Sequence, residues 1–136
     1  TQEKVMDGVE QNLRCNYGYL QSNPAFDTPD DTLGRLTYFC PGTYENGSVY
    51  NHGVAFKIYA DCLLGRADKA YESLQMILPT NPKNKKNGME PYAIANMYFG
   101  PETPVRAGYA PSSWITGTAG WMYRIVSEMM LGIKPD

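Results

Sequence analysis

Residues 52–78 read HGVAFKIYADCLLGRADKAYESLQMIL, and this stretch decides the fold class. Apolar residues recur at helical spacing in two runs, His52 to Leu64 and Asp68 to Leu78. Gly65 follows the first run as a helix C-cap would, and Pro79 stops the second. The pattern therefore predicts a helix hairpin with a tight turn at Gly65-Arg66.

Outside this hairpin, helical and loop patterns alternate. Helical spacing occurs at 3–20 and 118–131, loop chemistry at 21–50, 79–89 and 101–113, and an ambiguous helix or extended segment at 92–99. The apolar face of the last helix consists of Trp121, Met122, Ile125, Val126 and Met129. We therefore predict an all-α fold of helix hairpins with long functional loops. The last helix is apolar on more than one face, which a larger host structure or a dimer interface would cover equally well.

The composition excludes several classes of protein. The chain has 136 residues, with Lys+Arg 12 against Asp+Glu 14, a net charge of -2 and 43% apolar residues. These values suit one folded domain and lack the basic surface that nucleic acids or anionic membranes require. No apolar run approaches the ~20 residues of a membrane span, and the first ten residues do not resemble a signal peptide.

The three cysteines, Cys15, Cys40 and Cys62, are widely spaced and form no C-x-x-C pair. A disulfide would leave one thiol over, so we expect reduced thiols in a cytoplasmic protein. A zinc site takes about four ligands at close spacing. His52 is the only histidine and cannot complete such a site locally, so no metal is expected.

A first candidate site lies in TYENGSVY, residues 43–50. Asn46-Gly47 is a strong hairpin-turn signal, and a plain turn explains the segment about as well as a functional site does. The functional hypothesis is that Glu45 and Tyr44 lie together on this turn and bind a sugar. A carboxylate accepts hydrogen bonds from hydroxyl groups, and an aromatic ring packs against the ring face.

His52 is a second candidate, because it is expected at the start of a helix. Helix N-termini attract anions through free backbone N–H groups and the positive end of the helix dipole. An imidazole there can add a donor to a bound phosphate. A packing or capping histidine is the more common explanation for a single histidine.

A third candidate is SSWITGTAGW, residues 112–121, where hydroxyl groups and glycines precede an apolar helix. N-capping by Thr116 or Thr118 explains part of the pattern. Gly117 and Gly120 go beyond capping, because they let the backbone approach a ligand closely. A small anion held at the Thr116-Gly117 turn is physically reasonable.

Other sequence signals of catalysis are missing from the chain. It contains no glycine-rich nucleotide loop, no G-x-S-x-G elbow and no E-x-x-H metal pair. The carboxylates are scattered, and no acid–base pair can be chosen by pattern.

Four segments together resemble the C-terminal stretch of the catalytic barrel of glycoside hydrolase family 94, the inverting β-glycoside phosphorylases. These are PGTYENGSVYNHG (41–53), ADCLLGRADKAYE (60–72), MEPYAIANMY (89–98) and SWITGTAGWMYR (113–124). They follow the family's order at nearly the family's spacing over most of residues 41–133. Each motif alone is not specific, whereas the combination is.

The resemblance implies that residues 1–136 are the C-terminal segment of an (α/α)6 barrel catalytic domain, completed by the remainder of the parent barrel. There, inorganic phosphate attacks a β-linked oligosaccharide and yields an α-sugar 1-phosphate, which is a glycosyltransferase reaction of carbohydrate metabolism with no cofactor. The motif match implies that His52, Thr116 and Gly117 bind the phosphate and that Glu45, with Tyr44, binds the acceptor sugar. Gly53 follows His52 where many members carry another residue, which leaves the acceptor open.

The resemblance also places parts of the site outside this chain. The family's general acid is an aspartate from an upstream part of the barrel, and its phosphate-binding arginines and β-sandwich lie upstream too. Inverting chemistry needs an acid on the leaving oxygen while the nucleophile attacks the opposite face. We therefore expect the isolated chain to be inactive. Many such phosphorylases are homodimers, so the resemblance also leaves a homodimer possible for the parent protein.

Two further hypotheses stay open at this point. One is the phosphorylase-like domain of a cyclic β-glucan synthase, which shares the C-terminal motifs. The other is a non-catalytic helical module that binds carbohydrate regardless of phosphate, in which substitution of His52 or Thr116 has little effect.

Overall fold

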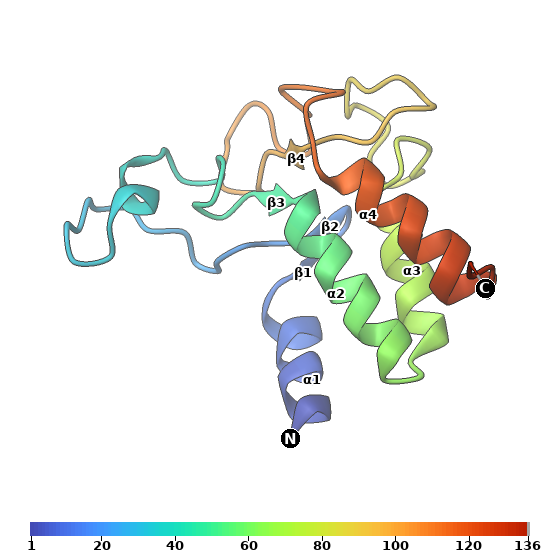
Figure 1. The fold of residues 1–136 in the computed structure, drawn as a ribbon. Helices are drawn as coiled ribbons and strands as arrows, with labels where there is room; N and C mark the ends of the chain where they lie inside the picture. Colours follow the sequence, from blue (N-terminus) through green and yellow to red (C-terminus); the bar gives the residue numbers. More distant parts are fainter. Residues whose placement is uncertain (136) are drawn as a thin grey trace.

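The computed structural model describes residues 1–135, which form a mostly helical fold with two small two-stranded sheets (Figure 1). The elements are α1 (Gln2–Asn12), β1 (Arg14–Cys15), β2 (Gly18–Tyr19), the 3-10 helix η1 (Arg35–Tyr38), β3 (Val49–Tyr50), α2 (Asn51–Leu63), α3 (Ala67–Ile77), β4 (Met97–Tyr98), α4 (Thr118–Arg124) and the π-helix η2 (Ile125–Met130). The all-α prediction is thus confirmed as a mostly helical chain, with the strands as an addition. Within these residues, no helix is both long and apolar enough to cross a bilayer.

Helices α2 and α3 form the predicted hairpin. Gly65 adopts a φ of 71°, and the backbone N–H of Arg66 donates to the carbonyl of Asp61 at 2.9 Å, which closes the turn. Ile58 of α2 and Ile77 of α3 are fully buried against each other's helices in the hydrophobic core. The local signals of periodicity and a glycine cap therefore predicted this unit correctly.

The N-terminal helix is shorter than the predicted 3–20. It ends at Asn12, and the chain turns back as the antiparallel pair β1–β2, with Arg14 opposite Tyr19. Gly18 lies so close to Val49 that an added Cβ would be 2.5 Å from its Cγ1. Because this tertiary contact fixes the hairpin, Tyr17 in its turn and Tyr19 in β2 are buried outside any helix.

A buried ion cluster joins α1 to the hairpin. The ammonium of Lys57 lies 2.6 Å from Glu10 and 2.7 Å from Asp61, and Arg66 lies 3.3 Å from Asp61. The Lys57 side chain is only 7% exposed and that of Asp61 is fully buried. Burial alone would lower the pKa of Lys57, but hydrogen bonds with Asp61 and Glu10 outweigh it, and the pKa is raised.

The second sheet resolves the ambiguous segment 92–99 as partly extended. Strand β4 pairs antiparallel with β3, with Val49 opposite Tyr98. The Tyr98 hydroxyl donates to the carbonyl of Ile77 at 2.8 Å, which attaches the sheet to the end of α3. The sheet therefore links the loop before α2 to the segment that precedes α4.

The last helix changes its winding along its length. Helix α4 continues directly into η2, and the backbone N–H of Leu131 donates to the carbonyl of Val126, five residues earlier. One extra residue per turn rotates the following side chains, so that Met130 packs on the core and the predicted Met129 is absent from that cluster. Of the five residues predicted for the apolar face, Trp121, Met122 and Ile125 belong to this cluster, whereas Val126 and Met129 do not.

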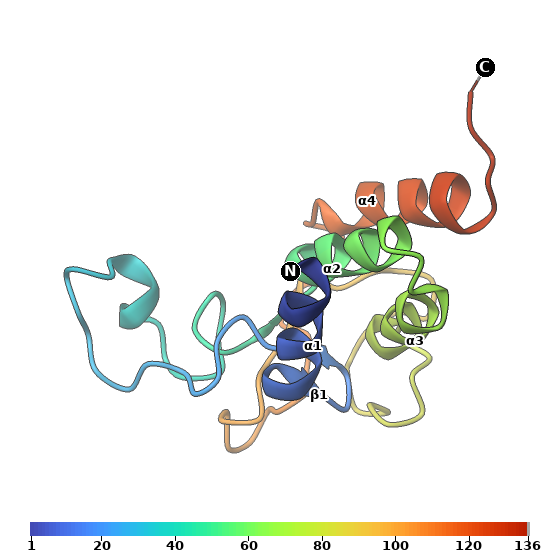
Figure 2. The same ribbon diagram turned by 90° about the horizontal axis from the view of Figure 1, so that it is seen from below.

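The predicted long loop between β2 and β3 extends away from the helices in both views (Figures 1 and 2). Asn46, which is fully buried, organises its interior. The Asn46 amide accepts the N–H of Phe26 at 2.8 Å and donates to the carbonyl of Phe39 at 2.7 Å. One amide thus stabilises two separate parts of the loop.

Candidate functional site

His52 and Gly117, which are distant in the sequence, lie against each other at the adjoining ends of α2 and α4 (Figure 1). His52 is in the first turn of α2, and Gly117 immediately precedes α4. A Cβ built on Gly117 would be 2.9 Å from Cε1 and 3.3 Å from Nε2 of His52. The missing side chain at Gly117 therefore provides the space that the imidazole occupies.

The His52 imidazole is held by packing, which leaves its nitrogen free. Its ring centroid lies 4.9 Å from that of Phe56, which in turn lies 4.9 Å from that of Trp121. Nε2 is buried and has no hydrogen-bond partner in the described residues. A buried polar atom normally has a partner, so a polar ligand atom would complete this one.

Both helix starts next to this imidazole have unused backbone donors. The N–H groups of His52 and Gly53 in α2, and of Ala119 and Gly120 in α4, donate to no acceptor within residues 1–135. These N–H groups carry the positive ends of the two helix dipoles. The arrangement therefore favours an anion at this point.

Thr116 shapes the turn before α4. Its hydroxyl oxygen accepts the N–H of Thr118 at 3.0 Å and donates to the Thr118 hydroxyl at 2.6 Å. The N-cap of α4 is Gly117 and carries no side-chain cap, so the hypothesis that Thr116 or Thr118 caps this helix was wrong, and Thr116 instead closes the turn onto Thr118. At Gly120, by contrast, an added Cβ would have no neighbour within 4 Å. A shallow hollow of about 350 Å³ is lined by Gly117, Gly120, Trp121 and Arg124.

Asn51, which pattern reasoning missed, ties the loops around His52 together. Its backbone N–H donates to the carbonyl of Asn96, and its side-chain amide donates to that of Ala95, each at 3.0 Å. Ala95 also forms an isolated bridge with Ser113. The asparagine directly before His52 at a helix start was the available sequence signal.

Tyr44 and Glu45 lie on a turn, but not the turn that the sequence predicted. The bridge between Thr43 and Asn46 places Tyr44 and Glu45 at its centre, so the Asn46-Gly47 hairpin prediction was wrong. Tyr44 has a φ of 47° and its ring centroid lies 4.9 Å from that of Phe39. Both side chains are exposed, as a role in binding requires.

The described residues connect this turn to the imidazole only through the backbone. Within 1–135, no hydrogen bond, ion pair or ring contact joins Tyr44 or Glu45 to His52. Strand β3 leads directly from the turn into α2. Of the five predicted residues, the structure therefore brings His52, Thr116 and Gly117 together at one place and leaves the other two on the preceding loop.

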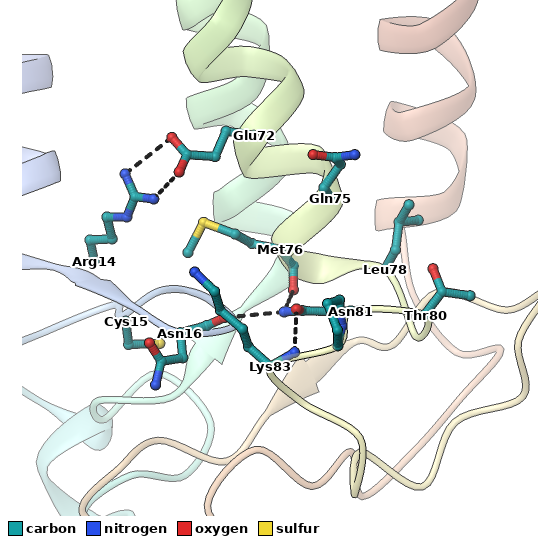
Figure 3. A pocket seen from close by; sticks show the side chains of 11 residues that line it. Arg14, Cys15, Asn16, Glu72, Gln75, Met76, Leu78, Thr80, Asn81 and Lys83 are labelled. Carbon is teal, nitrogen blue, oxygen red and sulfur yellow. Dashed lines mark hydrogen bonds and ion pairs between the residues drawn. The ribbon is translucent and has the colours of Figure 1, made fainter.

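A separate pocket of about 390 Å³ lies between β1 and the end of α3 (Figure 3). Arg14 points into it but is paired with Glu72 and Glu10. Asn81, on its floor, donates to the carbonyls of Asn16 and Met76. Arg14 and Asn81 thus find their polar partners within the fold.

Among residues 1–135, histidine, cysteine and carboxylate side chains form no group of three that could hold a metal ion.

Comparison with known proteins shows which family and which relatives the chain resembles. Residues 1–132 match the Glycosyl hydrolase 94 superfamily, catalytic domain. The chain is 46% identical over 134 residues to a solabiose phosphorylase of Paenibacillus borealis. The aligned region covers 97% of the chain and 17% of that protein. It is 40% identical over 124 residues to a 3-O-β-D-glucopyranosyl-β-D-glucuronide phosphorylase of the same organism, covering 90% of the chain and 16% of that protein.

A more distant relative completes the comparison. The chain is 33% identical over 134 residues to an N,N'-diacetylchitobiose phosphorylase of Vibrio proteolyticus, covering 97% of the chain and 17% of that protein. The chain thus spans about a sixth of the length of these relatives, with shares of 17%, 16% and 17%.

Proposed function

Because the chain belongs to the glycosyl hydrolase 94 superfamily, as part of its catalytic domain, we propose that it supplies the phosphate-binding wall, and part of the acceptor-sugar wall, of a β-glycoside phosphorylase. The substrate is a β-linked di- or oligosaccharide, inorganic phosphate is the co-substrate, and the product is an α-sugar 1-phosphate. All three relatives described above are named as phosphorylases of glycosides or of a related disaccharide.

The proposal depends chiefly on one observation, the buried and unpartnered Nε2 of His52 between two helix starts. Protonated on Nε2, the imidazole donates a hydrogen bond to a phosphate oxygen. The free N–H groups of Ala119 and Gly120 supply further donors, and Thr116 holds the turn that presents them. Together these groups fix the position of the nucleophile.

The reaction needs one group that we place outside these residues. A phosphate oxygen forms a bond to the anomeric carbon while the bond from that carbon to the bridging oxygen breaks. A carboxylic acid on the opposite side gives its proton to the leaving oxygen, and the configuration inverts. We assign this acid to another part of the catalytic domain and expect residues 1–136 alone to show no turnover.

The architecture proposed for the whole domain follows from the same assignment. We propose that the chain is the C-terminal segment of an (α/α)6 barrel. Exposed apolar side chains support this, because a neighbouring helix would bury them: Leu63 of α2, Tyr123 of α4, and Leu131 at the C-cap of η2. The free thiols of Cys15, Cys40 and Cys62 support the proposed cytoplasmic location.

The test is phosphate release from α-D-glucose 1-phosphate by the full-length protein that contains this chain. Glucose, a short β-glucan and N-acetylglucosamine serve as alternative acceptors. We expect acceptor-dependent release that falls about 100-fold in His52→Ala, the scale on which a lost oriented donor acts. Tyr71→Ala, on an exposed face of α3, is the matched control and should keep its activity.

Two results would contradict the proposal. Full activity in His52→Ala would remove the imidazole from the phosphate site. Absence of release with every acceptor, together with sugar binding that is indifferent to phosphate, would favour a non-catalytic binding module.

A further inference from the structure

Two aromatic side chains near the candidate site are largely exposed and lie next to each other. Tyr92 is 77% exposed and Trp114 is 67% exposed. Their ring centroids are 6.0 Å apart and their planes are inclined by 55°. Nothing in the assignment of His52, Thr116 and Gly117 to phosphate makes use of this pair.

Glu90 contacts Trp114, one member of the pair. One of its oxygens, Oε1, accepts long hydrogen bonds of 3.4 Å from Nε1 of Trp114 and from the hydroxyl of Ser113. Trp114 has a φ of 70°, an unfavourable backbone conformation for a bulky residue, which the surrounding loop has to stabilise. The carboxylate also accepts a hydrogen bond from its own backbone N–H, and no side chain within the described residues donates to Oε2, which can therefore accept one from a ligand.

The pair belongs to the same two loops that surround His52. The bridge between Ala95 and Ser113 joins these loops, and Asn51 attaches them to the start of α2. Trp114 precedes Thr116 by two residues, so their Cα atoms are at most about 7 Å apart. A molecule bound on the Trp114 ring therefore lies beside the proposed phosphate.

We propose that Tyr92, Trp114 and Glu90 form a subsite for one pyranose ring of the oligosaccharide substrate, which rests on the proposed function. A pyranose has apolar C–H faces that pack on aromatic rings, and its hydroxyls donate to a carboxylate. Two inclined rings with a free carboxylate oxygen offer both contacts at one place. Glu45 and Tyr44, which lie on the loop before α2, would bind a different part of the sugar substrate. The subsite proposed here is instead built on the loop that carries Thr116.

The test combines a kinetic and a spectroscopic readout on the full-length protein. Trp114→Ala should raise the KM for glucose as acceptor about three- to tenfold, the equivalent of one aromatic packing contact, and leave the KM for α-D-glucose 1-phosphate within about twofold. Trp114→Phe should restore most of the loss, because it keeps a ring. Tyr71→Ala, whose ring is also exposed but lies on α3, is the matched control.

Iodide quenching of tryptophan fluorescence measures binding without turnover. Glucose or cellobiose should protect a quenchable fraction in the unmodified protein, and that fraction should be missing in Trp114→Phe. If no acceptor supports phosphate release but this protection persists, the sugar subsite stands and only the proposed reaction fails.

Three outcomes would overturn the subsite. The first is an unchanged glucose KM in Trp114→Ala. The second is a Trp114 fraction that iodide cannot reach in the absence of sugar, which would mean that other parts of the protein cover the ring. The third is equal losses for Trp114→Ala and Trp114→Phe with an unchanged quenchable fraction, which would mean that Trp114 only supports the loop.

Discussion

The close approach of Gly117 to His52 predicts that a methyl group added at Gly117 will weaken phosphate binding while it leaves the stability of the fold nearly unchanged. In Gly117→Ala the new Cβ would be 2.9 Å from Cε1 of His52. Carbon atoms in favourable contact are about 3.5 Å apart or more, so the imidazole has to move by about 0.6 Å. The backbone of Gly117 has φ of -71° and ψ of -11°, which alanine adopts without strain.

The two effects of this methyl group differ in size. The fold should keep its stability to within about 1 kcal/mol, because alanine lowers the entropy of the unfolded chain while the helix start loses a favoured glycine. A displaced imidazole weakens a hydrogen bond to a charged ligand that is worth about 1.5–3 kcal/mol. We therefore expect kcat/KM for α-D-glucose 1-phosphate to fall about ten- to hundredfold.

The assay compares Gly117→Ala with Gly8→Ala in the full-length protein. Gly8 lies in the middle of α1, where an added Cβ has no neighbour within 4 Å, so its variant should keep full activity and gain stability. Thermal unfolding measures stability, and initial rates against donor concentration measure kcat/KM. Unchanged kinetics in Gly117→Ala, or an equal loss in both variants, would refute the reasoning.

Three further predictions concern stability and reactivity. Asp61→Ala should destabilise the protein by about 3 kcal/mol in urea unfolding, because it removes one of the two carboxylates that pair with the buried Lys57 ammonium, whereas Arg124→Ala, which breaks an exposed pair, should cost less than about 1 kcal/mol. Burial would raise the pKa of Glu10, but hydrogen bonds from its neighbours outweigh it and lower the pKa from 4.5, so this carboxylate stabilises the fold above that pH. Unfolding free energy should therefore fall as the pH drops below about 4.5, and less steeply in Glu10→Gln; equal slopes would contradict this sign. Iodoacetamide should label the exposed Cys40 before Cys15, whose thiol pKa is raised by burial. Mass spectrometry after a brief reaction measures the order, and earlier labelling of Cys15 would contradict the prediction.

Sequence reasoning predicted those parts of the fold that depend on neighbouring residues. The α2–α3 hairpin follows from apolar periodicity and the Gly65 cap, which are local signals. The end of α1 could not be predicted in this way, because Tyr17 fits the helical spacing although the contact of Gly18 with Val49 requires a hairpin. Nor could pattern predict that Lys57 and Asp61, which read as an ordinary i,i+4 surface pair, are buried beneath α1.

The candidate site was predictable in its parts but not in its assembly. Local patterns indicated an anion-binding helix start at His52 and a glycine turn at Gly117. Only the family resemblance implied that they share one ligand, since their contact joins distant parts of the chain. The aromatic pair of Tyr92 and Trp114 carried no local signal, because it forms when two loops meet across the bridge between Ala95 and Ser113.

The π-turn of η2 has a consequence for length variation among related sequences. A turn closed between Leu131 and Val126 contains one residue more than an α-helical turn. Deletion of one residue within Ile125–Met130 would convert it to regular α-helix and leave the preceding contacts of Met122 untouched. We expect relatives that are one residue shorter at this point to keep the same core, with the residue equivalent to Met130 packed on it from a regular α-helix. Insertions or deletions elsewhere in α4 should be far less tolerated.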